Sequence, residues 1–513
     1  MRFQIAGPGD EAALAELFAH IDTTFFRPHD FTPAMAAEIA GRSGRDLFAL
    51  LFDGDMPVAY GLLRGWDEGY ETPSLGIAVR TGLFGRGIGR RMMRELHRAA
   101  AERGSSAVRL RVHEDNVRAR RLYERLGYVY AGEERGELVM NLSLPRISPG
   151  GVRLLHPDDP DWDIAIAAAH PSVFHSSGYH RYSAGFDNAE PYLAVLSDET
   201  GGLAWPYLLR DVEQVPGLHK TDRMDVTSAY GYPGPLVWGW GDERIAQALD
   251  RIAETWRRQQ VVSVFTRFNP LLGNDATIPL SPAWAAPGSR GVVAAGATVS
   301  VDLTEDADLI RARYRRDLRR QIRRCREAGL ETVEDTTWAS LPAFALQYRE
   351  TMERLGAADF YYFSLADFER LRRSLPHAAH LLITRRGDVV AAAGLFLESG
   401  DTVEWHLVST NSDLLHLSPA KVLVDDTITW AKRRGFKAMH LGGGLAGRED
   451  SLFWFKSGFS PRRHEFAVGG WVLDAGAYEG LAERRRASLP PGASLDTTFF
   501  PAYRARIVAG AAR

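Results

Sequence analysis

A basic, glycine-rich turn between a strand and a helix constrains the fold of this chain more than any other feature. The turn, GRGIGRR at residues 85–91, follows the strand-like run Ser74 to Val79 and precedes apolar residues at helical spacing. The first turn of a helix has unpaired backbone N–H groups and favours an anion, and glycines let the backbone approach a phosphate closely. The pattern predicts either a diphosphate-binding loop or simply a tight strand-to-helix connection.

A second motif follows one strand later. Val108 to Val112 alternates as a half-buried strand does, and it is followed by Asn116 and by the sequence LYERLGY at residues 122–128. Together the two motifs closely resemble those of the GNAT family of N-acetyltransferases, over nearly all of residues 1–145. The resemblance implies a mixed α/β fold, acetyl-CoA as the acyl donor and a small-molecule amine as the acceptor.

The resemblance implies a cofactor site in this first domain. Ile77 and Val79 would lie along the pantetheine, and Asn116 would contact the cofactor or orient the following helix. An asparagine after a strand is also an ordinary helix N-cap, so both roles stay open. The pyrophosphate would be held by the loop residues Arg86, Gly87, Ile88, Gly89, Arg90 and Arg91.

Two residues of this domain are candidates for proton transfer. Tyr123 occupies the position at which the family often has the general acid that protonates the departing thiolate; the alternative is a buried tyrosine that packs its helix. Glu71, next to the strand at residues 74–79, is the candidate general base, because a carboxylate there would act through one water. The alternative for Glu71 is a solvated loop charge.

Composition limits the other classes of function. At 513 residues the chain has room for about three domains, and its net charge of −3 does not indicate a nucleic-acid binder overall. Cys325 is the single cysteine, which excludes an internal disulfide and a zinc site built on several thiolates. The histidines have no metal-ligand spacing, and no run resembles a signal peptide or a membrane span. We therefore expect a cytoplasmic protein without a metal site or membrane insertion.

Changes in composition suggest the domain boundaries. The Pro- and Gly-rich stretch Leu144 to Gly151 ends a first domain at residues 1–145, and a weaker break near Gly288 to Ala297 divides the rest. Two similar α/β halves, 151–297 and 298–475, suggest a tandem repeat, followed by a C-terminal tail at 476–513. The expected fold is three mixed sheets with flanking helices, without a second glycine-rich loop as clean as the first.

Four motifs of the later halves form a distinctive set. They are DVTSAYGYPGP at 225–235, VFTRFNPLL at 264–272, GGG at 442–444 and LFWFKSGF at 452–459. Together they resemble the Fem-like branch of the acetyltransferase superfamily, over roughly residues 151–475. In that branch two such folds are fused, and an aminoacyl group passes from a charged tRNA to an amine.

The Fem-like resemblance implies further site residues. Lys456 would steady the oxyanion that develops when an amine attacks an ester, unless it is a surface lysine on an apolar-faced turn. Phe455, its neighbour, belongs either to the substrate site or to the core. Tyr230 and Arg267 would line an acceptor groove; the alternatives are a well-made turn and a capping side chain.

An arginine-rich helix is predicted at residues 309–328. Apolar residues recur there at helical spacing, and the exterior is coated with arginines, among them Arg316 and Arg320. The charged face of a helix usually contains both acidic and basic residues, and this one contains hardly any acidic residues. A tRNA acceptor stem fits it, because phosphate contacts by arginine need no sequence reading. Salt bridges to acidic segments such as Glu305 to Asp308, or a phosphorylated acceptor, fit it too.

The sequence therefore predicts a bifunctional acyltransferase. An acetyl-CoA-dependent N-acetyltransferase is fused to a Fem-like transferase that forms amide bonds from aminoacyl-tRNA, in natural-product or cell-wall precursor assembly. One alternative is that the C-terminal module uses acyl-CoA to N-acylate an amino sugar for a polysaccharide. Another is that it is a non-catalytic binding platform.

Overall fold

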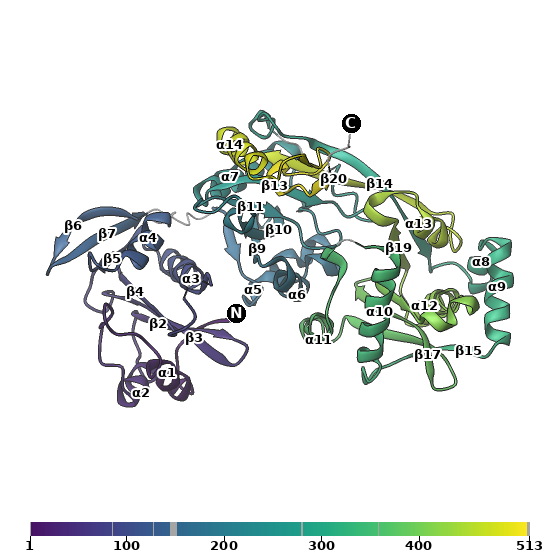
Figure 1. Ribbon diagram of the computed structural model, residues 1–513, viewed down its shortest axis with the longest axis horizontal. Coiled ribbons are helices and arrows are strands. Elements are labelled where there is room, and N and C mark those ends of the chain that lie inside the picture. Colours follow the sequence, from purple (N-terminus) through teal and green to yellow (C-terminus); the bar gives the residue numbers. More distant parts are fainter. Residues whose placement is uncertain are drawn as a thin grey trace. The chain divides into compact units, whose positions relative to one another are not determined.

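The computed structural model divides the chain into two compact units, Met1–Gly151 and Val152–Arg513 (Figure 1). It describes residues 2–84, 86–126, 128–143, 151–276, 278, 281–357 and 359–509. Gly85 of the glycine-rich turn and most of the predicted linker, residues 144–150, lie outside this described part. The two units are called unit 1 and unit 2 below.

Unit 1 is built on one seven-stranded sheet. Neighbouring strands of this sheet are antiparallel, except for β4 and β5, which run parallel. In sheet order the strands are β1 (Arg2–Ile5), β2 (Leu47–Asp53), β3 (Met56–Arg64), β4 (Ser74–Val79), β5 (Ala107–Val112), β7 (Glu137–Ser143) and β6 (Val129–Glu134). The strands predicted at 74–79 and 108–112 correspond to β4 and β5.

The alternation of side chains along β2 explains the two layers of helices in unit 1. Leu47, Ala49 and Leu51 pack in one core with helices α3 (Ile88–Glu102) and α4 (Val117–Arg125). The intervening residues, such as Phe48 and Leu50, pack in a second core with α1 (Glu11–Phe18) and α2 (Pro33–Ala40). Successive side chains of a strand point to opposite faces, so one apolar strand serves both layers.

Unit 2 is built on a single continuous sheet of thirteen strands. In sheet order these are β15 (Leu330–Glu334), β16 (Ala379–Arg386), β17 (Val389–Ser399), β18 (Thr402–Thr410), β19 (Ala438–Gly443), β14 (Gly291–Asp302), β20 (Arg463–Val472), β13 (Val261–Arg267), β11 (Met224–Thr227), β10 (Gly201–Asp211), β9 (Glu190–Asp198) and β8 (Arg153–Leu155), with β12 (Leu236–Trp238) paired to β10. The predicted α/β class is confirmed, but the two later halves share one sheet.

Helices pack on this sheet through amphipathic faces. In α7, for example, Ile245, Leu249 and Trp256 are buried against β10 and β13, while acidic and basic residues occupy the other side. The α-helices of unit 2 are α5 (Asp161–Ile166), α6 (Ser177–Asp187), α7 (Asp242–Arg258), α8 (Ala307–Ala312), α9 (Arg316–Glu327), α10 (Leu341–Leu355), α11 (Leu365–Ser374), α12 (Ala420–Arg433), α13 (Ser451–Lys456) and α14 (Ala475–Ala487). In the described residues, no helix is long and apolar enough to cross a bilayer.

The boundary expected between residues 297 and 298 falls inside a strand. β14 runs through it, pairing with β20 along most of its length and with β19 from Thr298 onward. β20, from the end of the second half, lies between β14 and β13 and so pairs directly with the first half. The halves cannot be cut apart at 297/298 without breaking the sheet.

The predicted tail at residues 476–513 is part of the folded unit as far as the structure describes it. α14 and the segment after it bury Tyr478, Phe500 and Tyr503 against Val262 and Val472. The Tyr503 hydroxyl also lies 2.7 Å from the Ser263 Oγ of β13. The proline and glycine residues of Leu489 to Ala493 predicted a surface connection. That short stretch is indeed mostly exposed.

Each half of unit 2 contains one parallel strand pair, as unit 1 does. β11 and β13 form the first pair and enclose α7 in the chain, and β18 and β19 form the second and enclose α12. In unit 1 the helix between β4 and β5 is α3. The same strand–helix–strand arrangement therefore occurs three times and gives three places to compare for a ligand site.

Candidate functional site

The parallel strands β4 and β5 separate almost at once. They are paired only at Ser74 and Arg109, whereas β4 stays paired with β3 as far as Val79. Beyond Ser74, the edge of β4 that faces β5 has no strand partner among the described residues. A peptide-like ligand can hydrogen-bond to such an open edge in the manner of an added strand.

The glycine-rich turn lies at the N-terminus of α3. Gly87 is the N-cap residue with φ of 77°, a left-handed conformation that glycine adopts without strain. The first hydrogen bond of the helix runs from the Arg91 N–H to the Gly87 carbonyl, 3.0 Å. The N–H groups of Gly87, Ile88 and Gly89 precede that bond, so they are positioned for an anion. A Cβ built on Gly87 would meet no atom within 4 Å, so the space in front of the turn is open.

Arg91 does not belong to the predicted diphosphate-binding loop. Its N–H is already used in the helix, and its Nε lies 3.0 Å from Oε1 of the buried Glu95. Arg86 is exposed and Arg90 half-buried, so these two remain at the loop surface. The anion-binding turn is therefore one residue shorter than the sequence suggested.

Gly89 brings the turn against β4 and α4. A Cβ at Gly89 would lie 3.4 Å from Leu122, 3.5 Å from Ile77 and 3.6 Å from Val79. Three of the residues predicted at the cofactor site are thus brought together, because Gly89 packs on the side chains of Ile77 and Val79 of β4. The next residue after Leu122 is Tyr123, so the candidate acid is carried by the same helix.

Tyr123 is buried, with 7% of its surface exposed, and its ring centroid lies 5.7 Å from that of Tyr128. Burial disfavours the phenolate and raises the pKa of Tyr123 to about 12. The phenol therefore holds its proton at neutral pH, as a general acid must before the reaction. The Tyr123 ring also belongs to the core of unit 1, so the alternative of a buried tyrosine that packs its helix holds as well.

The other two predicted residues take part in local hydrogen bonds. Asn116 is the N-cap of α4, and its side chain accepts from the Ala119 N–H at 3.2 Å. Glu71 is exposed, and its carbonyl accepts from the Ser105 hydroxyl beyond the C-terminal end of α3. α3 is about 22 Å long at 1.5 Å per residue, and Gly87 is at its other end. This placement gives no support to Glu71 as the base.

In unit 2 the predicted lysine is buried. Lys456 ends α13, has 8% of its surface exposed and donates from Nζ to the Gly443 carbonyl at 2.7 Å. Its Nζ also lies 5.1 Å from the ring centroid of Trp405. Burial lowers the pKa of Lys456 to about 7, although the Asp450 carboxylate opposes that shift. A surface lysine is therefore the wrong description.

The triple-glycine motif provides the space beside this ammonium. Gly442 has φ of +75°, and a Cβ there would lie 3.3 Å from Lys456 Nζ and 3.8 Å from the Tyr232 hydroxyl. Gly442 therefore separates two polar groups that reach it from the two halves of unit 2. Sequence reasoning placed Tyr232 in a motif without giving it a role.

A buried acid–base pair lies under Tyr232 and was missed from the sequence. His440 Nδ1 is 2.6 Å from Glu404 Oε2, both side chains are almost fully buried, and the Tyr232 ring packs on His440 at 5.4 Å. Glu404 and His440 are the last residues that β18 and β19 pair before the strands part. Charged residues within otherwise apolar strands were the available signal, because such residues are rarely buried unless paired.

Tyr230 and Arg267 lie near each other in the first half of unit 2. The Arg267 N–H and guanidinium both donate to the Ser228 Oγ, at 3.2 and 3.3 Å. Tyr230 packs edge-on against His406, with ring centroids 5.8 Å apart. Burial raises the pKa of Tyr230, and Arg267 opposes this. Phe455 packs instead against Phe459 and Trp405, which favours its core alternative.

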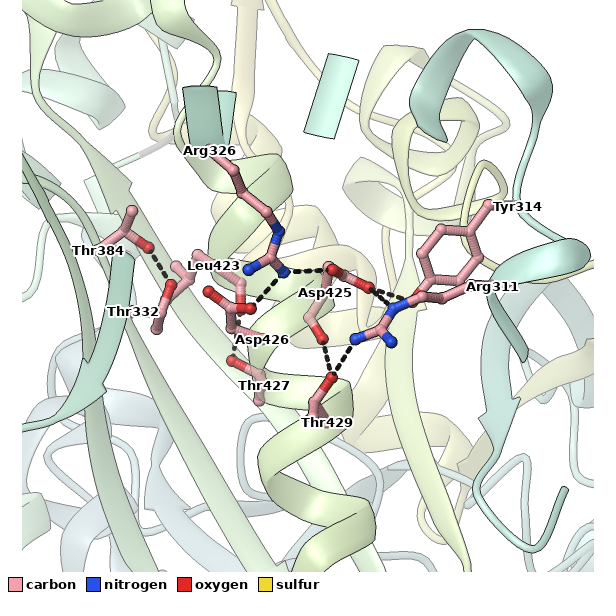
Figure 2. A network of polar contacts seen from close by, with 10 residues as sticks. All are labelled: Arg311, Tyr314, Arg326, Thr332, Thr384, Leu423, Asp425, Asp426, Thr427 and Thr429. Atoms are coloured by element: carbon pink, nitrogen blue, oxygen red, sulfur yellow. Dashed lines mark hydrogen bonds and ion pairs between the residues drawn. The ribbon is translucent and has the colours of Figure 1, made fainter. Parts of the chain in front are cut away.

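The predicted arginine-rich helix is two helices, α8 and α9, which lie beside α12 (Figures 1 and 2). The predicted apolar stripe, Ile310, Tyr314, Leu318, Ile322 and Cys325, is buried throughout. Arg316 and Arg320 are exposed on α9. Figure 2 shows that Arg311 and Arg326 instead turn inward to Asp425 on α12.

The helices that correspond to α3 do not repeat its open N-terminus. In α12 the Lys421 and Val422 N–H groups already donate to Ser418 and Pro419, each at 3.1 Å. α7 begins with Asp242 and Glu243, whose charges oppose a phosphate. Among the three, α3 alone combines a left-handed glycine cap with a first turn free of acids.

Comparisons with known proteins find a similar region in each unit. Residues 14–128 match the acetyltransferase (GNAT) family, and residues 312–456 match an acetyltransferase (GNAT) domain. The chain is 34% identical over 151 residues to a mycothiol acetyltransferase of Thermobispora bispora, a match that covers 29% of this chain and 48% of that protein. The chain thus spans about half the length of this curated relative.

Two solved structures resemble parts of the fold. The crystal structure of FemX is similar over 64% of this chain and 99% of its own, at 12% identity and a TM-score of 0.49. A GNAT-family acetyltransferase from Streptococcus pneumoniae is similar over 28% of this chain and 99% of its own, at 19% identity and a TM-score of 0.25. Unit 1 thus contains a region similar to the GNAT family, and a second region similar to a GNAT domain lies within unit 2.

Proposed function

We propose that unit 1 is an acetyl-CoA-dependent N-acetyltransferase. The observation that carries this proposal is that the α3 turn packs at Gly89 on β4, the strand whose edge toward β5 is open beyond Ser74. Bound acetyl-CoA would supply an acetyl group activated as a thioester. The N–H groups of Gly87 to Gly89 would hold its pyrophosphate, and the free edge of β4 up to Val79 would hydrogen-bond its pantetheine amides.

Tyr123 supplies the proton chemistry in this proposal. Its buried phenol keeps the proton on Oη at neutral pH and gives it to the departing sulfur. An amine attacks the carbonyl carbon, the C–N bond forms as the C–S bond breaks, and the amine proton leaves to a base. Positioning of the two reactants supplies much of the rate.

Gly87→Glu is expected to weaken acetyl-CoA binding by at least about 100-fold. The new carboxylate would stand at the anion-binding turn, and a non-glycine residue would be strained at φ of 77°. Isothermal titration calorimetry on the full chain measures this directly. The matched control is Gly104→Glu, since Gly104 has φ of +83° and open space but follows the opposite end of α3. If the two variants bound acetyl-CoA with equal affinity, the α3 turn would be excluded as the pyrophosphate-binding site.

For unit 2 we propose a second acyl transfer, from an aminoacyl ester to an amine. Lys456 is the residue that carries this part, because its ammonium lies beside the space kept open by Gly442. There it would stabilise the negative charge that develops on the carbonyl oxygen of the ester. The closed N-terminus of α12 favours a donor other than acyl-CoA. N-acylation of an amino sugar from acyl-CoA remains the alternative.

This second activity is expected to depend on RNA. The full chain is incubated with tRNAs charged with radiolabelled amino acids and with the small-molecule fraction of a cell extract as acceptors. We expect label to pass into small molecules, and the transfer to disappear after ribonuclease treatment or in Lys456→Met. Transfer from labelled acyl-CoA that is lost in Lys456→Met, without transfer from charged tRNA, would support the amino-sugar alternative. Absence of any Lys456-dependent transfer from either donor would favour a binding platform.

A further inference from the structure

Helix α9 presents a face of arginines opposite its buried side. Leu318, Ile322 and Cys325 are buried, and at 100° per residue the opposite side of the helix carries Arg316, Arg320 and Arg324, all exposed. These three arginines, at positions i, i+4 and i+8, define the outer face of α9. They lie in one row along the helix.

Ion pairs account for other arginines of this segment but not for the outer face. Arg311 and Arg326 bind Asp425, and Arg326 also binds Asp426 (Figure 2). The further pairs are Arg313 with Glu305, Arg315 with Asp317, and Arg323 with Glu327. Within the described part of the chain, the structure gives no ion pair for Arg316, Arg319, Arg320 or Arg324.

Of the three outer-face arginines, only Arg324 lies in the last turn of α9, where the helix dipole favours a cation. Arg316 is in the first turn, where the helix dipole disfavours a cation, and like charges four residues apart repel each other. The chain as a whole has a net charge of −3, so the arginines are concentrated here and do not reflect a basic protein. An uncompensated charge that a fold does not need is typical of a binding surface.

The basic surface continues from α9 onto α12. A groove of about 900 Å³ opens between α9, α12 and β15, and it is lined by Arg319 and Arg323 of α9 and by Arg433 of α12. The lining also contains four acids, and each has a basic partner: Asp425 and Asp426 pair with Arg326, Glu331 pairs with Arg385, and Glu334 pairs with His380. The groove therefore adds basic residues from a second helix beside the outer face.

We propose that the outer face of α9 and the adjoining groove rim bind the phosphate backbone of double-helical RNA. This inference rests on the proposed aminoacyl-ester donor of unit 2 and would give its tRNA stem a place to dock. The guanidinium fork suits phosphate oxygens, and a row of arginines along a 12-residue helix follows a backbone without reading bases. The apolar side of α9 is buried, so the helix has no free apolar face to insert into a membrane.

The test uses the full chain and a fluorescent RNA hairpin that mimics an acceptor stem. The triple variant Arg316→Ala, Arg320→Ala, Arg324→Ala is expected to bind it at least about tenfold more weakly. The slope of log affinity against log salt should fall by about three, roughly one unit for each lost phosphate contact. Alanine is as good a helix former as arginine, so α9 should keep its structure.

The matched control removes three arginines that are exposed and ion-paired on other helices. They are Arg258 of α7, Arg349 of α10 and Arg373 of α11, which pair with Glu254, Glu353 and Glu369. Their replacement by alanine removes the same charge and should leave RNA binding within about twofold of the unmodified chain. Equal weakening by the two triple variants would overturn the proposal, because it would show a general charge effect.

Two further probes separate other partners from RNA. Phosphatidylglycerol vesicles and polyglutamate are expected to bind more weakly than the hairpin, and preference for either would overturn the proposal. Ribonuclease-sensitive transfer that persists unchanged in the α9 triple variant would refute the docking surface and leave the proposed function standing. RNA binding that depends on α9, in a chain that transfers no aminoacyl group, would support the surface and refute the function.

Discussion

Replacing Asp225 by alanine is expected to lower the free energy of unfolding of unit 2 by about 3–5 kcal/mol. Asp225 is fully buried; its Oδ1 accepts from Arg210 Nε at 2.8 Å and its Oδ2 from Arg504 Nε. Burial alone would raise the pKa of Asp225, but the two guanidinium groups hold it below its ordinary value. Without the carboxylate, two largely buried cations face each other unpaired.

Denaturant unfolding followed by tryptophan fluorescence measures this effect, because 11 of the 12 tryptophans belong to unit 2 and only Trp66 to unit 1. Asp161→Ala is the control: its partner Arg153 lies 3.3 Å away at the surface, and the pair should contribute less than about 1 kcal/mol. A similar small loss in Asp225→Ala would show that the Arg504 segment is not needed to hold unit 2 together.

Lys456→Met is expected to stabilise unit 2 near pH 6 and to lose this advantage as the pH rises. Folding lowers the pKa of Lys456 from 10.5 to about 7, so between these values the unfolded chain binds more protons and stability increases with pH. Below pH 7 the full penalty of about 5 kcal/mol applies, less about 1 kcal/mol for the hydrogen bond to Gly443. The net gain is about 4 kcal/mol.

The measurement is the unfolding free energy of both proteins from pH 6 to 10. Lys432→Met serves as the matched control, because Lys432 Nζ also donates to a carbonyl, that of Leu303 at 3.0 Å, but is only half-buried. It should show no comparable pH-dependent gain. If the difference between Lys456→Met and the unmodified chain stayed constant over this range, the lysine would not be desolvated, and its proposed role beside the reacting carbonyl would lose its basis.

Local patterns predicted the parts of this protein that neighbouring residues determine. The strand at 74–79, the glycine turn and the arginine helix were all visible, because each follows from periodicity or from the conformational freedom of glycine. The apolar stripe that includes Leu318 and Ile322 is buried as predicted. The break between α8 and α9 was missed, since no proline or glycine marks it.

Long-range pairing determined the rest. No residue near Glu404 in the sequence predicts that its carboxylate contacts His440, because the two residues lie on separate strands joined through α12. The burial of Lys456 likewise depends on Trp405 and Gly443, which come from β18 and β19. Arg91 was misassigned for a simpler reason: Glu95, one helical turn away, offers an ion pair that competes with any ligand.

The position of β20 also sets an order of events during synthesis. β13 and β14 leave the ribosome early, but the strand that lies between them arrives only after β15 to β19 have been made. Until then the edges of β13 and β14 that face β20 stay unpaired, and Asp225 lacks its partner Arg504. Unpaired strand edges invite association with other chains. For unit 2 the most vulnerable period is therefore the time between translation of residue 302 and translation of β20 and Arg504, when a chaperone would protect it best.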